Sequence, residues 1–217
     1  MFCRITLPVS FFIVFFILIQ NVQAQRVQRF RAGIIAGLTA SQIDGDESYG
    51  YNKLGLQAGV RAAAILSKRA EGSIELLFAQ RGARNELVPN NINPNNFSLT
   101  LNYVEVPLQF HYKDWFTDDD EDGFYRVVVN GGISYGRLIN FRVNDDLSFI
   151  EVVAPYVNKN DFNYLLGATI YANRHLGFTI RASRGIGFIY NPAKWDTPPS
   201  AKKWYSHALY FQAVYML

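Results

Sequence analysis

The residues of this chain that could support hydrolysis are its three histidines, one of which follows a serine. They are His111, His175 and the pair Ser206-His207. A serine nucleophile needs a base and an orienting acid within hydrogen-bond reach. Glu105 shares an expected strand face with His111, but six residues of extended chain span about 20 Å. The spacing therefore indicates no catalytic residues, and a lipid-modifying enzyme is only an alternative function.

The acidic segment Asp118–Gly123 matches the first half of a calcium-binding loop, in which carboxylates alternate before a glycine. Such a loop ends on a bidentate glutamate at its twelfth position, and Val129 stands there. We therefore expect a solvated turn, with no metal site and no cofactor.

Seven charged side chains share expected strand faces with glycines and other small residues. An unpaired charge in a narrow, weakly polar interior is costly, so we expect Glu75 and Glu105 to pair with arginines there. This network is expected to be a structural plug, and a gated ion or proton path is the alternative. The seven residues are Lys53, Arg61, Glu75, Arg81, Glu105, Arg126 and Arg181.

The segment Lys53–Leu66 shows the pattern that positions these charges. Apolar residues such as Leu56 and Val60 alternate with small or polar residues such as Gln57 and Arg61. A period of two is typical of a β-strand. The same alternation predicts eight strands, over Phe30–Ala40, Lys53–Leu66, Gly72–Gly82, Leu99–Tyr112, Phe124–Leu138, Asp161–Ala172, Leu176–Ile189 and Trp204–Leu217.

The connections between these strands alternate in length. Those after the second and sixth strands are very short, whereas those after the first, third, fifth and seventh are long. Transmembrane barrels show this asymmetry, together with aromatic girdles near strand ends. Within the fourth strand, Pro107 cannot donate to a ladder, so a bulge or a missing bond is expected there. The aromatic residues expected in girdles are Tyr112, Trp115, Phe116, Phe124, Tyr125, Tyr171, Trp204 and Tyr205.

Alternation alone does not say which face points inward, and a soluble lipocalin-like barrel would bury the apolar face. The charged residues on the other face favour a membrane barrel. The interior of an eight-stranded barrel is only just wide enough for side chains, and small residues beside paired charges fit it. We therefore expect apolar side chains to face lipid and no aqueous channel to exist.

The N-terminal segment is typical of a Sec-type signal peptide. Arg4 precedes an apolar core from Phe11 to Ile19, and small residues precede a cleavage site between Ala24 and Gln25. The division is thus 1–24 signal peptide and 25–217 barrel domain. Removing Arg4 leaves 20 basic and 18 acidic residues, a near-neutral balance that gives no case for nucleic acid binding.

The last strand ends on alternating apolar residues, Phe211, Ala213, Tyr215 and Leu217. This pattern resembles the terminal signal read by the outer-membrane barrel assembly machinery, although phenylalanine is commoner than leucine at its end. We expect Phe211, Tyr215 and Leu217 to serve as that assembly signal.

Five stretches of the chain resemble the PorT-like outer-membrane β-barrel proteins of Bacteroidota. The resemblance implies an eight-stranded barrel in the outer membrane with a periplasmic N-terminus, and it supplies no catalytic residues. One member of that family belongs to the type IX secretion machinery. The stretches are GLTASQIDGDESYGYNKLGLQAGV (37–60), ELLFAQRGAR (75–84), NYVEVPLQFHY (102–112), GGISYG (131–136) and DFNYLLGATI (161–170).

These observations predict a monomeric, non-enzymatic outer-membrane barrel surrounded by lipid. A partner at the cell surface would bind the long loops, and an accessory role in a type IX-like secretion machinery is the alternative. The loops expected to form that surface are Ser41–Asn52, Ala83–Ser98, Ile139–Asn160 and Tyr190–Lys203.

Overall fold

All eight strands expected from the sequence are present in the computed structural model, which describes residues 29–44, 50–85, 97–118, 123–145, 156–194 and 203–217. β4 and β5 are the longest, at 21 and 22 residues. No helix in these described ranges is long and apolar enough to cross a membrane. The elements are β1 (Phe30–Asp44), β2 (Lys53–Ile65), β3 (Ala70–Asn85), β4 (Phe97–Thr117), β5 (Phe124–Asp145), β6 (Asn160–Tyr171), β7 (Leu176–Gly185), a 3₁₀ turn η3 (Pro192–Lys194) and β8 (Tyr205–Met216).

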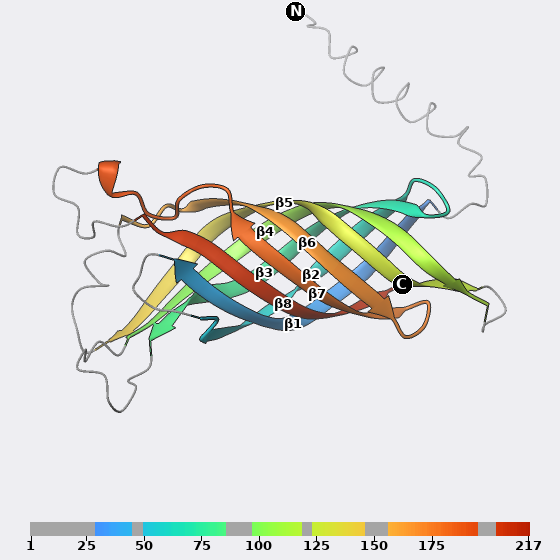
Figure 1. Ribbon diagram of the computed structural model, residues 1–217, viewed down its shortest axis with the longest axis horizontal. Coiled ribbons are helices and arrows are strands. Elements are labelled where there is room, and N and C mark those ends of the chain that lie inside the picture. The colour runs from blue at the N-terminus through green and yellow to red at the C-terminus, as the bar shows by residue number, and fades with distance from the viewer. Residues whose placement is uncertain (1–28, 45–49, 86–96, 119–122, 146–155, 195–202) are drawn as a thin grey trace, which may run out of the picture.

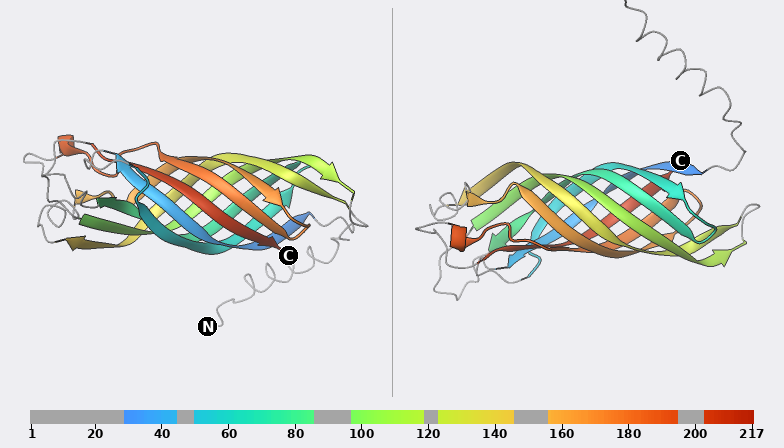
Figure 2. Two further views of the ribbon diagram at one scale, coloured as in Figure 1. Left: turned by 60° about the horizontal axis from the view of Figure 1, so that its bottom comes forward. Right: turned by 90° about the horizontal axis from the view of Figure 1, so that it is seen from above.

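The strands close into a barrel because β8 pairs with both β7 and β1. Each strand is antiparallel to its neighbours, which confirms the predicted eight-stranded up-and-down barrel. Figures 1 and 2 show the strands wrapping obliquely around an elongated barrel. The strand ends joined by the β2–β3, β4–β5 and β6–β7 connections lie at one end of the barrel, here called the short-turn end (Figure 1). The strand ends joined by the other four connections lie at the opposite end, here called the long-loop end.

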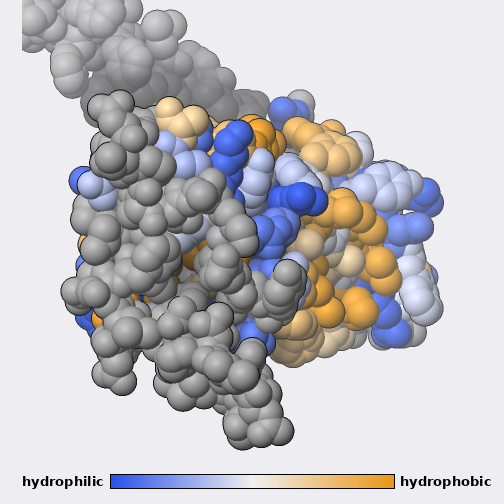
Figure 3. Space-filling view, turned by 60° about the vertical axis from the view of Figure 1, so that its left-hand side comes forward, coloured by the Kyte–Doolittle hydropathy of each residue, from blue (hydrophilic) through white to orange (hydrophobic). Residues whose placement is uncertain are grey.

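The barrel wall is apolar, whereas the middle of the lumen is largely polar. Leu54, Leu56 and Val60 are 71%, 60% and 52% exposed on the outside of β2, whereas Gln57 and Arg61 are 2% and 3% exposed on its inside. Figure 3 shows hydrophobic residues gathered along the wall between more hydrophilic regions. A soluble barrel would have the opposite arrangement, so the wall is suited to lipid.

Pro107 interrupts one of the two ladders of β4. On the β5 side it pairs in register with Ser134, whereas on the β3 side the ladder skips two successive pairs around it. A proline has no N–H to donate, which accounts for the interruption expected from the sequence. The register shift of the β4–β5 pair lies elsewhere, at Asn102/Tyr103, where β5 contains the extra residue Ile139.

Two glycines allow neighbouring strands to approach more closely than a side chain would permit. A Cβ atom at Gly59 would lie 2.1 Å from the carbonyl oxygen of Leu76. Gly82 has a φ of +150° and would place a Cβ 1.9 Å from the carbonyl oxygen of Leu99. The Gly82 N–H donates to Ser41 Oγ at 2.9 Å, which links β3 to β1 across β2. Both positions therefore require glycine.

Val60→Arg is expected to block insertion of the barrel, because it places a guanidinium on the apolar wall. An arginine on the lipid-facing wall costs about 2–4 kcal/mol near the membrane midplane. The measurement is heat-modifiable mobility of the protein in outer-membrane fractions on gel electrophoresis. Val60→Leu is the matched control and should assemble normally. A normally assembled Val60→Arg barrel would contradict the assignment of this face to lipid.

Candidate functional site in the barrel lumen

Glu75 on β3 forms the centre of one ion cluster in the lumen. Arg61 on β2 lies directly opposite in the register and donates Nε to Glu75 Oε1 at 2.7 Å. Arg181 reaches across from β7, donating Nη1 to Glu75 Oε2 at 2.9 Å and Nη2 to Oε1 at 3.1 Å. All three residues are at most 3% exposed. The two-point contact of Arg181 thus joins opposite walls of the barrel.

Arg81, also on β3, forms a second cluster nearer the long-loop end. Its guanidinium pairs with Glu105 on β4 and donates Nη1 to Asp161 Oδ2 on β6 at 2.8 Å. The rings of Tyr103 and Tyr210 lie 5.3 Å and 5.7 Å from Arg81 Cζ, within the range of cation–π attraction. Tyr210 on β8 also donates to Glu105 Oε1 at 3.4 Å. This cluster therefore connects four strands.

The two clusters balance in charge only when they are taken together. The Glu75 cluster contains two guanidinium groups and one carboxylate, and the Arg81 cluster contains one guanidinium group and two carboxylates. Loss of one member leaves a buried charge without its partner, which typically costs about 3–5 kcal/mol. The two clusters together carry no net charge, and their side chains fill the middle of the lumen.

Five of the seven charged residues named from the sequence lie in these clusters: Arg61, Glu75, Arg81, Glu105 and Arg181. The other two lie near strand ends, where their side chains reach solvent. Lys53 is half-buried at the long-loop end of β2, where Nζ donates to Ser98 Oγ at 3.0 Å. Arg126 is half-buried near the start of β5. Neither belongs to the two ion clusters.

Asp161 is the cluster member that the sequence analysis missed. It is 2% exposed and accepts a hydrogen bond from Asn163 Nδ2 at 2.9 Å in addition to its contact with Arg81. Its position in the alternation is the signal that could have found it. Asp161 and Asn163 share the face of β6 opposite the exposed Phe162 and Tyr164.

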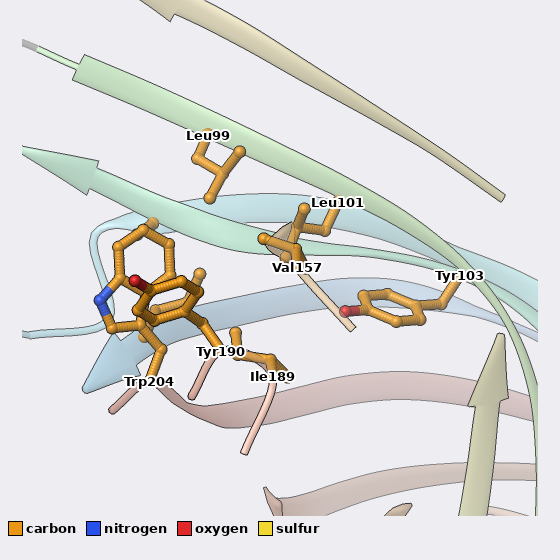
Figure 4. Close-up of a cluster of buried hydrophobic side chains, with 9 residues drawn as sticks. Leu99, Leu101, Tyr103, Val157, Ile189, Tyr190 and Trp204 are labelled. Atoms are coloured by element: carbon orange, nitrogen blue, oxygen red, sulfur yellow. The ribbon is translucent and has the colours of Figure 1, made fainter. Parts of the chain in front are cut away.

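An apolar cluster fills the lumen at the long-loop end. Figure 4 shows its side chains pointing into one space, with Tyr190 and Trp204 side by side. Their ring centroids are 5.3 Å apart. This apolar cluster lies between the Arg81 cluster and the long-loop end of the barrel. Its member Tyr103 contacts Arg81. The buried members are Ile43, Ala83, Leu99, Leu101, Tyr103, Val157, Ile189, Tyr190 and Trp204.

The aromatic girdles expected from the sequence are only partly on the wall. Tyr112, Trp115 and Phe116 are 46%, 64% and 54% exposed near the short-turn end. The assignment was wrong for Trp204, which is 2% exposed inside the lumen, and for Tyr171, which packs against a second buried apolar cluster. Trp204 and Tyr171 both stand at positions whose side chains point into the barrel in the alternation of their segments. This alternation, rather than their aromatic character, decides which way they point.

A cavity of about 370 Å³ lies at the short-turn end of the lumen. Arg61 of the Glu75 cluster lines its inner part, and Arg174 of the β6–β7 turn lines its edge. Glu71 and Lys113 form an ion pair in its lining, and His111 is a further lining residue. The cavity is thus bounded by the ion clusters on one side and by the short turns on the other.

The serine and histidine side chains do not form a catalytic triad. Ser206 is buried in the lumen, whereas His207 lies on the other face of β8 with Nε2 2.8 Å from Asp44 Oδ2. His111 instead contacts Ser73, with Nε2 and Oγ 2.6 Å apart. In the part of the chain that the structure describes, no acidic side chain pairs with the other ring nitrogen of His111. Ser73 and His111 are therefore paired as a nucleophile and a base would be, but no described acidic side chain orients the histidine.

Two expectations fall on residues that the structure leaves undescribed. The signal peptide, with its cleavage site between Ala24 and Gln25, precedes the first described residue. Most of the calcium-like turn also lies outside the described ranges. Among the described residues, no group of three or more His, Cys, Asp or Glu side chains is placed to hold a metal ion.

Comparison with known proteins identifies the family. The sequence profile of the "Outer membrane protein beta-barrel domain" matches residues 21–191, which is more than half of the chain. The chain belongs to this outer-membrane β-barrel family. The protein is therefore an outer-membrane protein. The resemblance to PorT-like proteins of Bacteroidota is a finer assignment and stays a prediction.

Two solved structures of outer-membrane proteins match this chain at low sequence identity. The attachment invasion locus protein Ail of Yersinia pestis, in complex with the heparin analogue sucrose octasulfate, has a TM-score of 0.45 and 11% identity, covering 87% of this chain and 99% of its own. Neisserial surface protein A has a TM-score of 0.43 and 10% identity, covering 85% and 96%. A search of curated proteins found no significant match.

Glu75→Gln is expected to lower the free energy of unfolding of this outer-membrane barrel by about 3 kcal/mol, because Arg61 and Arg181 lose their shared carboxylate. Urea unfolding in detergent micelles, followed by tryptophan fluorescence, measures the change. Asp114→Asn removes the same charge from an exposed position on β4 and should change the unfolding free energy by less than about 0.5 kcal/mol. Equal effects of the two substitutions would show that the cluster does not stabilise the barrel.

Proposed function

We propose that this protein is a closed, non-enzymatic outer-membrane barrel that acts through its long-loop end, as an interaction or structural component of the membrane. The filled lumen is the observation that carries the proposal. Two ion clusters and an apolar cluster follow one another along the barrel axis, and their members are almost completely buried. Transport of bulk solutes would need a continuous aqueous path, which eight strands do not leave.

The proposed orientation places the short-turn end in the periplasm and the long loops at the cell surface. The support is the asymmetry of the connections, since outer-membrane barrels have short periplasmic turns and longer extracellular loops. Strands β1, β3, β4 and β5 extend into the segments expected as loops. The proposed interaction surface thus stands on long, paired strands, as binding loops on rigid scaffolds commonly do.

A non-enzymatic role is supported by the positions of the serine and histidine side chains. Ser206 and His207 point to opposite faces of β8, and the Ser73–His111 pair has no orienting acid among the described residues. Ser73 is 3% exposed, and it is not among the described side chains that line the cavity. A substrate ester would therefore not reach this hydroxyl.

The proposed partners are outer-membrane lipid along the wall and the barrel assembly machinery during insertion. A monomer is supported by the closed ring of strand pairs, which leaves no edge for pairing with another chain. A partner protein, glycan or host surface would bind the long loops. Co-purification with secretion components would instead support the accessory role in a type IX-like machinery.

The purified barrel is expected to show no large conductance steps in planar lipid bilayers, because two ion clusters and an apolar cluster fill the lumen. A sixteen-stranded porin, whose lumen holds a water-filled channel, serves as the positive control in the same bilayers. Stable, porin-sized steps from the folded barrel would overturn the proposed function.

Removal of Tyr215–Leu217 is expected to prevent assembly, because these residues complete the closure of the barrel. Tyr215 pairs with Ile34 of β1 and with Leu176 of β7, and the Leu217 N–H donates to the carbonyl of Ala32 at 2.8 Å. Heat-modifiable mobility and membrane fractionation measure assembly. Leu217→Phe is the control and should assemble normally. A truncated chain that still forms a heat-modifiable barrel would contradict the assigned assembly signal of Phe211, Tyr215 and Leu217.

A further inference from the structure

Two arginines stand on the outer wall of the barrel near the long-loop end. Arg137 on β5 pairs in register with Asn160, and Arg184 on β7 pairs with Tyr164, so these two arginines flank β6 on its opposite sides. Both arginine side chains are exposed. The cost of an arginine on the lipid-facing wall of a barrel falls from the membrane midplane toward the interface. The two arginines therefore fit the interfacial region of the wall, where charged lipid headgroups lie.

The charge of Arg184 has no counter-charge among the residues that the structure describes. Tyr164 and His207 stand beside it in the register, on β6 and β8. Within the described ranges, no side chain forms a hydrogen bond or an ion pair with its guanidinium group. Asp44 lies on β1, beyond β8, and its carboxylate oxygens are 2.8 Å from Gln42 Nε2 and 2.8 Å from His207 Nε2. That carboxylate is thus already engaged by two other side chains.

Arg137 is held in place by a neutral partner. Its Nη1 donates to Asn160 Oδ1 at 2.6 Å, and the Tyr135 hydroxyl donates to the same oxygen at 2.9 Å. An amide oxygen carries no net charge, so these contacts orient the Arg137 side chain without neutralising it. Both guanidinium groups therefore present positive charge on the outside of the barrel.

Aromatic side chains occupy the wall between the two arginines. Phe162 and Tyr164 point outward from β6, and the rings of Phe162 and Tyr135 are 5.1 Å apart. Toward the middle of the barrel the wall continues with exposed aliphatic side chains, Leu166 on β6 and Ile180 on β7. Aromatic rings with a polar tip are typical of the membrane interface, and aliphatic side chains are typical of the hydrocarbon region. The wall thus offers cationic groups near its end and apolar contacts beside them.

We propose that this surface, here called the arginine wall site, binds a membrane lipid whose headgroup carries an anionic phosphate. A guanidinium group donates paired, charge-assisted hydrogen bonds to phosphate oxygens, and the acyl chains lie along Leu166 and Ile180. A free anion would use the guanidinium groups alone, whereas a lipid also covers the apolar surface beside them. Charge and hydrophobicity together therefore favour a lipid. The site consists of Tyr135, Arg137, Asn160, Phe162, Tyr164 and Arg184.

The arginine wall site specifies the class of lipid that contacts the wall, and it rests on the proposed function in that respect. In the proposed orientation the long-loop end lies at the cell surface, so the bound lipid belongs to the outer leaflet. The residues of the site and their charges are the same in either orientation. Only the choice of leaflet therefore depends on which end faces outward.

Quenching of a fluorescent label by brominated lipids tests the proposal. Residues 25–217 contain no cysteine, because the one cysteine of the chain is Cys3. Ala182→Cys therefore gives a single labelling position on the outer wall of β7, two residues from Arg184. The folded, labelled mature barrel is reconstituted into phosphatidylcholine vesicles that contain phosphatidic acid, with one or the other lipid brominated. Phosphatidic acid is expected to be enriched about fivefold beside the label.

Arg184→Gln is expected to reduce this enrichment at least about twofold, because it removes one of the two charges that attract phosphate. Arg184→Lys keeps the charge and should retain most of the enrichment. Arg29→Gln is the matched control, since it removes the same charge from an exposed position just before β1, at the short-turn end. This control should leave the enrichment unchanged. Heat-modifiable mobility verifies folding, and Arg137→Gln gives a second test if Arg184→Gln does not fold.

Equal quenching by the two brominated lipids would overturn the proposal, as would an equal loss of enrichment in Arg184→Gln and Arg29→Gln. Loss of the enrichment in excess inorganic phosphate, at constant ionic strength, would also overturn it, because the site would then bind the free anion. Both leaflets of the vesicles have the same composition, so the result does not depend on orientation. The conductance of the barrel is measured separately, so failure of this site and failure of the closed-barrel function are distinguishable.

Discussion

The contact of Glu75 with Arg61 and Arg181 constrains the rest of the barrel. The lumen of eight strands has room for side chains and little else, so a charge placed there must meet an opposite charge at hydrogen-bond distance. Arg61 meets Glu75 between adjacent strands, whereas Arg181 meets it across the lumen. The contact between Arg181 and Glu75 requires β3 and β7 to keep a fixed position relative to each other along the barrel axis. Strand register and lumen chemistry therefore depend on each other.

This constraint divides the lumen into layers with different chemistry. An apolar layer lies at the long-loop end, paired ions fill the middle, and a cavity of about 370 Å³ lies at the short-turn end. The ion clusters and the apolar layer lie between the two ends of the barrel. We therefore place the proposed interaction surface at the long-loop end of the barrel, outside the filled lumen.

Most of the fold was predictable from the alternation of residues, and the departures have physical reasons. β4 and β5 extend beyond their predicted ends because paired strands continue through weakly patterned sequence such as that after Leu138. Trp204 was assigned to the membrane interface by residue type, but its inward parity places it in the lumen. Five of the charged residues named from the sequence lie in the two ion clusters, and Asp161 was missed although the same alternation marks it.

The sequence by itself determined the eight strands and which residues share a strand face, because both follow from a period of two along one segment. The charged and small residues on one face then favoured a polar lumen and an apolar wall. Only the tertiary structure decided which charges meet. Arg181 and Glu75 are 106 residues apart, and Arg81 and Asp161 are 80 residues apart. Such pairs depend on the stagger of strands around the closed barrel, which no local pattern specifies. The cavity at the short-turn end has the same origin, since its lining comes from strands and turns that only closure of the barrel brings together.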